Sequence, residues 1–176
     1  MLNKKERTTR SKRISENKLK IRNELWPTID QDLFYDRTKE SGFTTIPRTM
    51  PLILHLMDEL SNGKPISSTF LSLWCRVFDE GMVVLKNPKE LAFEAGFTGE
   101  RAETTWRTRM KTLVELGFIN AKPGTSGDFH YVLIFNPHKI IGKLKAENKL
   151  HQTASYNAYY ERLIEIGASN SKEEEV

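Results

Sequence analysis

The sequence is poor in cysteine. Its 176 residues include a single one, Cys75, so no disulfide bond can form within the chain. Cys75 lies in an apolar helical pattern, which predicts a buried thiol. Structural disulfides belong to oxidising compartments, and the charged N-terminus lacks the apolar segment of a secretory signal. We therefore expect a cytoplasmic protein.

Long apolar runs and catalytic clusters are also missing. No run approaches the roughly 20 apolar residues of a membrane-spanning helix, so no membrane contact is expected. Adjacent carboxylates occur at residues 58–59 and 79–80, but no nucleophile, base or metal ligand accompanies them. The histidines are scattered and form no metal-ligand pair at a recognisable spacing. The sequence thus predicts no metal and no cofactor, and it argues against an enzyme, a nuclease included. The four histidines are His55, His130, His138 and His151.

The net charge of +4 is unevenly distributed. Residues 1–22 have nine Lys or Arg and two Glu, a charge of +7, which leaves −3 for the rest of the chain. A cationic segment of this kind is typical either of an arm that contacts DNA phosphates or of a solubilising terminus. We expect residues 1–22 to form a flexible basic arm, in which Arg10, Lys12 and Arg13 are candidate phosphate contacts.

Regular structure is predicted from residue 46 onward. Residues 23–45 lack clean periodicity, and we expect them to cover the main domain with one short helix. Thr49 precedes a helical pattern that it can cap, and Ser67 or Ser68 can cap a second one. The next signals are a β-branched run at residues 82–85, compatible with a short strand, and Asn87-Pro88, a capping residue directly before a first-turn proline. Residues 46–148 are therefore expected to form the main domain.

The helix predicted at residues 100–116 has two distinct sides. At about 100° per residue, Ala102, Met110 and Leu113 fall on the same side as Trp106, which indicates a buried stripe. Gly117 follows the last apolar turn, where a left-handed residue ends a helix. The other side presents hydroxyls and cations to solvent. These residues are Arg101, Thr104, Thr108 and Lys111, with Arg107 on the flank.

A β-hairpin is predicted after this helix. Residues 118–122 and 129–135 alternate as strands do, and the Pro, Gly and Ser residues between them suit a hairpin loop. Asn136-Pro137 then begins another helix.

These segments resemble the winged helix-turn-helix family. Asn-Pro-Lys-Glu-Leu-Ala-Phe-Glu-Ala-Gly-Phe resembles the first helix of the motif, and Thr-Trp-Arg-Thr-Arg-Met-Lys-Thr-Leu-Val-Glu-Leu-Gly-Phe-Ile resembles the recognition helix and the start of the wing. Leu-Ile-Phe-Asn-Pro is similar to winged helices of plasmid and phage replication or copy-control proteins. The resemblance covers residues 46–140. It implies a mostly α fold with a small β-hairpin wing, flanked by an N-terminal arm and a C-terminal helix.

The resemblance implies sequence-specific binding of double-stranded DNA, by a small transcriptional regulator or a plasmid- or phage-type replication or partition factor. Helix 100–116 would read the major groove, because Arg and Lys donate to guanine and phosphate and Thr meets phosphate or thymine. Lys122 and His130, which flank the hairpin loop, are further candidate phosphate contacts. The alternative is a winged-helix module that binds another protein in a larger complex, which the charge of −3 outside the arm favours.

A last helix is expected within residues 149–168, before an acidic tail at residues 169–176. Tyr156, Tyr160 and Leu163 align on one side of it. Tyrosines suit an interface because each has a large apolar body and a hydroxyl, so this side predicts a homodimer. The alternative is that the helix folds back onto its own domain.

Overall fold

The computed structural model describes residues 4–77, 79–151 and 153–168, and for residues 4–11 and Gln31 it describes the backbone alone. The predicted acidic tail at residues 169–176 lies outside the described residues. The chain divides into two compact units, Met1–Phe43 and Thr44–Val176. We describe each unit by itself.

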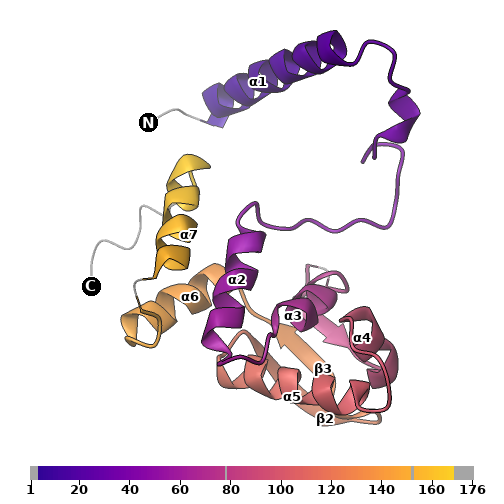
Figure 1. Ribbon diagram of the computed structural model, residues 1–176, viewed down its shortest axis with the longest axis vertical. Helices are drawn as coiled ribbons and strands as arrows, with labels where there is room; N and C mark the ends of the chain where they lie inside the picture. Colours follow the sequence, from indigo (N-terminus) through magenta and orange to yellow (C-terminus); the bar gives the residue numbers. More distant parts are fainter. Residues whose placement is uncertain (1–3, 78, 152, 169–176) are drawn as a thin grey trace. The chain divides into compact units, whose positions relative to one another are not determined.

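The first unit is dominated by one long helix. Helix α1 spans Lys4–Leu25, drawn in indigo in Figure 1, so the segment expected to be a flexible arm is helical. Lys, Arg, Glu and Leu favour helix, and their propensity outweighs the lack of an apolar stripe. The helix ends before Pro27, which disfavours helical geometry in the residue ahead of it.

The rest of this unit is a short connecting segment. It contains a single 3-10 turn, η1 at Gln31–Leu33, which corresponds to the one short helix expected at residues 23–45. Cations stack on its aromatic rings: the Arg22 guanidinium carbon lies 4.6 Å from the centre of the Phe34 ring, and that of Arg37 lies 4.9 Å from the Phe43 ring. Both contacts lie within the first unit. That residues 23–45 cover the main domain stays a prediction.

The second unit begins with two packed helices. Helix α2 spans Met50–Leu60 and α3 spans Ser67–Trp74. The prediction that a serine caps α3 is wrong, because the carboxylate of Asp58 on α2 caps this helix instead. It accepts hydrogen bonds from the amides of Ile66 and Ser67 at 2.7 and 2.8 Å. Thr49 makes no capping bond to α2 and is buried instead.

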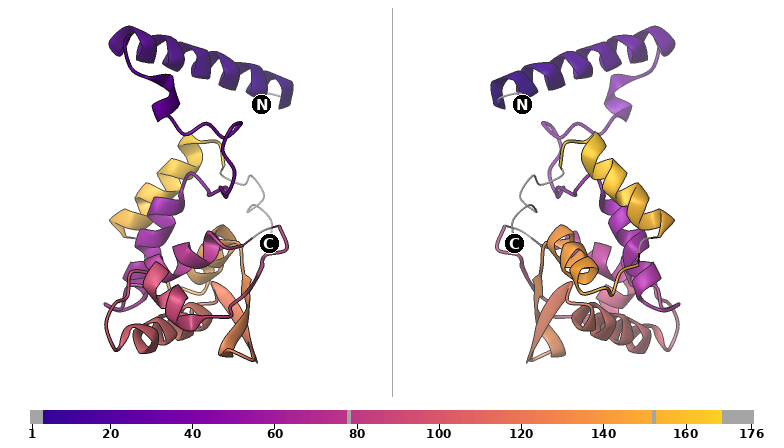
Figure 2. Two further views of the ribbon diagram at one scale, coloured as in Figure 1. Left: turned by 90° about the vertical axis from the view of Figure 1, so that its right-hand side faces the viewer. Right: turned by 90° about the vertical axis from the view of Figure 1, so that its left-hand side faces the viewer.

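Three short strands form one antiparallel sheet in the order β1-β3-β2. Figure 2 shows α3, α4 and α5 on one side of it. On that side Val83 of β1 and Ala121 of β2 both lie opposite Val132 of β3. The residues that alternate with these, Met82, Val84, Asn120, Lys122, Tyr131 and Leu133, are exposed. The strands are β1 at Met82–Val84, β2 at Ile119–Gly124 and β3 at Gly127–Ile134.

Helices α4 and α5 pack against each other, and α5 also contacts β2. Helix α4 spans Pro88–Glu94, and the side chain of Asn87 caps it by accepting a bond from the amide of Glu90, as predicted. Helix α5 spans Ala102–Glu115. Its predicted stripe is confirmed, with Trp106, Met110 and Leu113 fully buried. Gly117 ends the helix at a φ of 81°.

The last two helices are α6 at Pro137–Ala146 and α7 at Ala154–Glu165. Helix α7 folds back and packs on α2, as Figure 1 shows in yellow and purple. Glu59 of α2 accepts hydrogen bonds from the hydroxyls of Thr153 and Ser155 at the start of α7. Of the predicted interface residues, Tyr156 and Leu163 pack against the core, and Tyr160 is exposed. The structure therefore shows the second of the two predicted arrangements, in which the last helix folds back onto its own domain.

About half of the chain is helical and the rest includes one small antiparallel sheet, which agrees with the predicted combination of helices and a hairpin. The buried thiol expected at Cys75 is wrong, because this residue follows the last turn of α3 and is exposed. Within the described residues, no helix is both long and apolar enough to cross a membrane.

Candidate nucleic-acid interface

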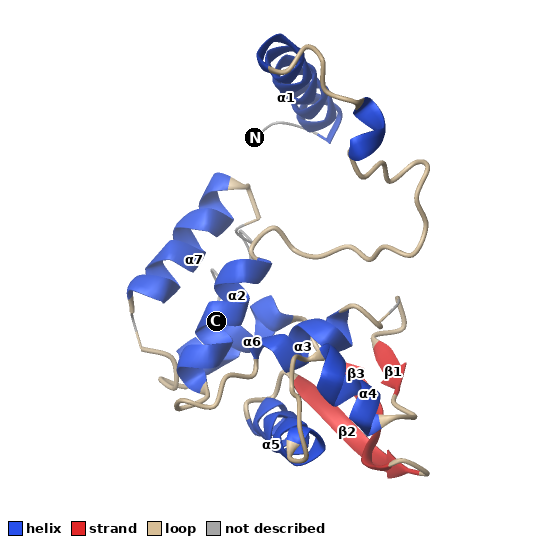
Figure 3. Ribbon diagram, turned by 45° about the vertical axis from the view of Figure 1, so that its right-hand side comes forward, coloured by secondary structure: helices blue, strands red, loops and turns tan. Residues whose placement is uncertain are grey.

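The outward side of α5 is the surface on which the predicted DNA contacts lie. Arg101, Thr104 and Lys111 are exposed, and Thr108 is half-buried. In Figure 3 α5 runs close to the β2–β3 hairpin, and the helix contacts β2 directly. The structure thus brings four of the predicted residues onto one helix face. Because the opposite face is buried, this is the side of α5 that can meet a ligand.

Two threonine hydroxyls on or beside this face form hydrogen bonds within the helix. Thr108 donates to the carbonyl of Thr104 at 3.0 Å, and Thr112 donates to the carbonyl of Thr108 at 3.2 Å. Such bonds one turn back along a helix are common for threonine. They use the hydroxyl protons but leave the methyl groups and oxygen lone pairs available. Thr108 and Thr112 therefore offer methyl contacts and acceptors rather than donors.

Arg107 links α5 to the hairpin. Its guanidinium donates twice to Oε1 of Glu103, at 3.0 Å from Nε and 2.8 Å from Nη2. Its Nη1 lies over Gly127, where the Cβ of any other residue would come within 3.3 Å. Gly127 also has a φ of 106°, which L-residues rarely adopt. Part of the charge of Arg107 is thus compensated by Glu103, a partner four residues away that the sequence analysis did not assign.

The two predicted hairpin contacts differ. Lys122 is an exposed residue of β2. His130 is only 6% exposed, so its predicted contact with phosphate is wrong. Its Nδ1 lies 2.7 Å from the hydroxyl of Ser126, which also bonds the carbonyl of Leu85. The imidazole covers Gly124 so closely that a Cβ there would lie 2.3 Å from its ring. His130 therefore shapes the hairpin tip from within.

The basic residues of the first unit lie on α1. Lys12 and Arg13 are exposed. The backbone of Arg10 belongs to the same helix, and its side chain lies outside the described residues. The basic residues of α1 are spread around the helix in its sequence. They therefore make the helix positively charged without defining one binding face.

Comparison with known proteins gives no relative. No protein-family model, no curated protein and no solved structure matches the chain.

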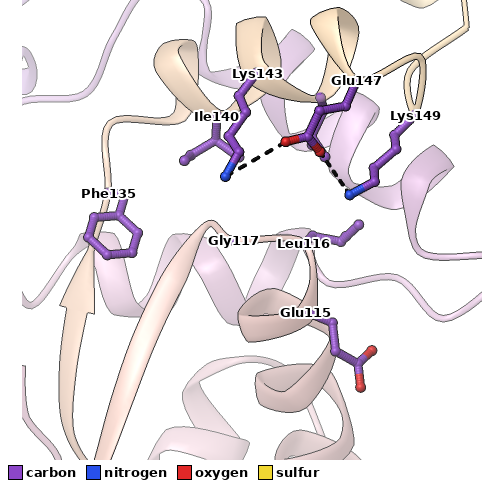
Figure 4. A pocket seen from close by; sticks show the side chains of 9 residues that line it. Glu115, Leu116, Gly117, Phe135, Ile140, Lys143, Glu147 and Lys149 are labelled. Atoms are coloured by element: carbon purple, nitrogen blue, oxygen red, sulfur yellow. Dashed lines mark ion pairs between the residues drawn. The ribbon is translucent and has the colours of Figure 1, made fainter.

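A groove that the sequence analysis did not single out lies at the C-terminal end of α5. It measures about 560 Å³, and its floor includes Leu116 and Ile140. Figure 4 shows Lys143 and Lys149 pointing toward Glu147, whose carboxylate lies 3.8 and 2.8 Å from their ammonium nitrogens. The hydrogen bond from Lys149 is the main cause that lowers the pKa of Glu147. Glu115 also lines the groove, so its two lysines and two glutamates have no net charge that would select a charged ligand.

Across the described ranges, no three His, Cys, Asp or Glu side chains gather in a group that could hold a metal ion.

Proposed function

We propose that the second unit is a winged helix-turn-helix unit that binds double-stranded DNA, with α5 in the major groove and the β2–β3 hairpin as the wing. The order of its elements supports this proposal: two helices, a short strand, the pair α4 and α5, and then a hairpin. Helix-turn-helix proteins place the second helix of such a pair in the groove while the first crosses the backbone.

One observation carries the proposal, namely the two-sided character of α5. Its inner side is fixed in the core by Trp106, Met110 and Leu113. Its outer side exposes Arg101, Thr104 and Lys111 over three turns. The helix has 14 residues, a length of about 21 Å, which spans the width of a major groove with a turn to spare. A rigid helix that aims cations and methyl groups outward has the chemistry for base edges and phosphates.

Affinity would come from other parts of the chain. Thr44–Val176 has sixteen basic and sixteen acidic residues, so this unit attracts DNA weakly by overall charge. Non-specific affinity depends on cations placed near phosphates. In the proposal, Lys122 on the wing and the cations of α1 supply it. The protein would then act as a small regulator of transcription or as a replication or partition factor of the plasmid or phage type.

A second candidate function is a winged-helix module that docks onto another protein. The outer face of the sheet favours it, because Tyr131, Leu133 and Val84 are apolar and exposed there. A contiguous apolar surface of this kind marks protein contacts more often than DNA contacts.

Binding of a labelled mixed-sequence duplex at two salt concentrations tests the proposal. Lys111→Ala should weaken binding and reduce the salt slope by about one unit, because each phosphate contact releases a counterion. Lys139→Ala, an exposed lysine on α6, serves as the matched control and should leave binding unchanged. A full chain that binds no duplex even at low salt would refute DNA binding and favour the protein module.

A further inference from the structure

The groove at the C-terminal end of α5 has an apolar floor between charged residues of both signs. Leu116 follows the last turn of α5, and Ile140 and Leu144 line the groove from α6. Leu144 is 4% exposed, and the other two residues are half-buried. At about 560 Å³ the groove has the size of a site for a small ligand. Its floor can therefore cover the apolar groups of such a ligand.

Two lysines are held together on the α6 side of the groove. The ammonium of Lys149 lies 2.8 Å from Oε2 of Glu147, and that of Lys143 lies 3.8 Å from Oε1. Figure 4 shows both side chains pointing toward this one carboxylate. An ammonium group has three donors, so each lysine keeps donors for a further acceptor. This side of the groove can therefore bind a carboxylate of a ligand without losing its own ion pairs.

Glu115 supplies the opposite charge from the α5 side. Its side chain is exposed, and within the described residues it forms no ion pair. In Figure 4 it stands apart from the lysines, with Leu116 between them. Exposed side chains change rotamer within nanoseconds, so this carboxylate can turn to meet an ammonium group above the floor. The groove thus matches a negative group at its α6 side and a positive group at its α5 side.

We propose that this groove binds a short peptide of about two residues, with free ends and apolar side chains. The carboxylate of the peptide would contact Lys143 and Lys149, and its amino group would contact Glu115. The apolar side chains would cover Leu116 and Ile140. This inference does not depend on DNA binding, because every group it uses lies in the groove.

Charge and size together select this ligand. A ligand with a single charge would leave one side of the groove unmatched, whereas a peptide with free ends carries both charges and has no net charge. If the groove is equally wide in each direction, it measures on the order of 8 Å across, and two extended residues span about 7 Å. In a free amino acid both charged groups are attached to the same carbon atom, so they cannot reach both sides.

Isothermal titration calorimetry of the full chain with leucyl-leucine tests the proposal. For a ligand of this size we expect a dissociation constant on the order of 0.1–1 mM. Three comparison ligands each lack one feature: the N-acetylated dipeptide lacks the ammonium group, the C-terminal amide lacks the carboxylate, and free leucine lacks the separation of charges. Each should bind more weakly than leucyl-leucine.

Variants of the groove identify the contacts. Lys149→Ala should weaken the binding of leucyl-leucine about two- to fivefold but should not weaken binding of the amide further. Glu115→Gln should likewise weaken leucyl-leucine and leave the N-acetylated form unaffected. Lys139→Ala on α6 and Glu161→Gln on α7 are the matched controls, because both residues are exposed and neither lines the groove. Thermal unfolding of each variant verifies that the fold is kept.

Three results would overturn the proposal. In the first, about 10 mM leucyl-leucine produces no binding heat and no change in thermal unfolding. In the second, both capped forms bind as well as the free dipeptide, which would show that the charged ends make no contact. In the third, the groove variants bind like the original chain, which would place the peptide elsewhere. Weaker binding that depends on the matching end of the ligand supports the proposal, since a merely structural role of Lys149 or Glu115 would not produce it.

Discussion

The hydroxyl of Tyr159 lies 2.7 Å from Nδ1 of His138, and the other ring nitrogen of His138 lies 3.3 Å from the hydroxyl of Thr49. This chain of three polar side chains joins α7, α6 and the start of α2. Thr49 and Tyr159 are buried. A neutral imidazole has one donor and one acceptor nitrogen, so it can serve both hydroxyls at once. This connection adds to the packing of α7 on α2.

Stability should decrease in mild acid because of His138. Burial lowers the pKa of this histidine, so the unfolded chain binds its proton more readily than the folded one. The contribution of neutral His138 to the free energy of unfolding should therefore be fully present above the pKa of about 6.5 in the unfolded chain. It should decrease as the pH drops below that value. Urea unfolding between about pH 7.5 and 5.5 measures this change. His138→Gln should lose the pH dependence, whereas His151→Gln, at an exposed site, should keep it.

Trp106 should stabilise the fold through the volume of its buried side chain rather than through its indole nitrogen. Its side chain is fully buried and meets Phe129 edge-on at 6.0 Å between ring centres. Its indole nitrogen has no hydrogen-bond partner among the described residues. Trp106→Ala should therefore cost about 3–5 kcal/mol, and Trp106→Phe clearly less. Denaturant unfolding compares the two. Equal losses would show that the indole nitrogen makes a bond that matters.

Removing the partner of Arg107 should strengthen DNA binding. Glu103 holds the guanidinium and places a negative charge beside the proposed interface. Glu103→Gln should free Arg107 for phosphate or guanine and raise the affinity about two- to fivefold at low salt. Arg107→Ala should lower it. Glu161→Gln, an exposed change on α7, is the control. Weaker binding by Glu103→Gln would mean that the ion pair positions Arg107 productively.

Deletion of residues 1–22 should flatten the salt dependence of DNA binding. This segment contains nine basic residues and forms most of α1. Each neutralised phosphate contributes about −0.9 to the slope of log K against log salt, so an arm that uses half its cations changes the slope by several units. Fluorescence anisotropy across a salt series measures the slope. An unchanged slope after deletion would identify α1 as a solvated helix.

Local signals in the sequence predicted the elements that depend on neighbouring residues. The apolar spacing around Trp106 identified the buried side of α5, because helical geometry alone determines which residues share a face. Asn87 and Gly117 bounded helices as expected, since a cap acts within one turn of the chain. The exposed residues Arg101, Thr104 and Lys111 followed from the same periodicity. For α1, intrinsic propensity outweighed the composition that had suggested a flexible arm.

Only the tertiary structure decided the relationships that join distant residues. Asp58 caps α3 from another helix, and α7 packs on α2 with Tyr156 and Tyr159 in contact with α6. His130 is buried because the hairpin brings Ser126 and Gly124 against its ring, a contact that a strand pattern does not specify. Likewise, the alternation of β1 showed that Met82 and Val84 share a face, and strand order showed that they lie at a free edge. Periodicity reports which side of an element is apolar, whereas packing determines what covers it.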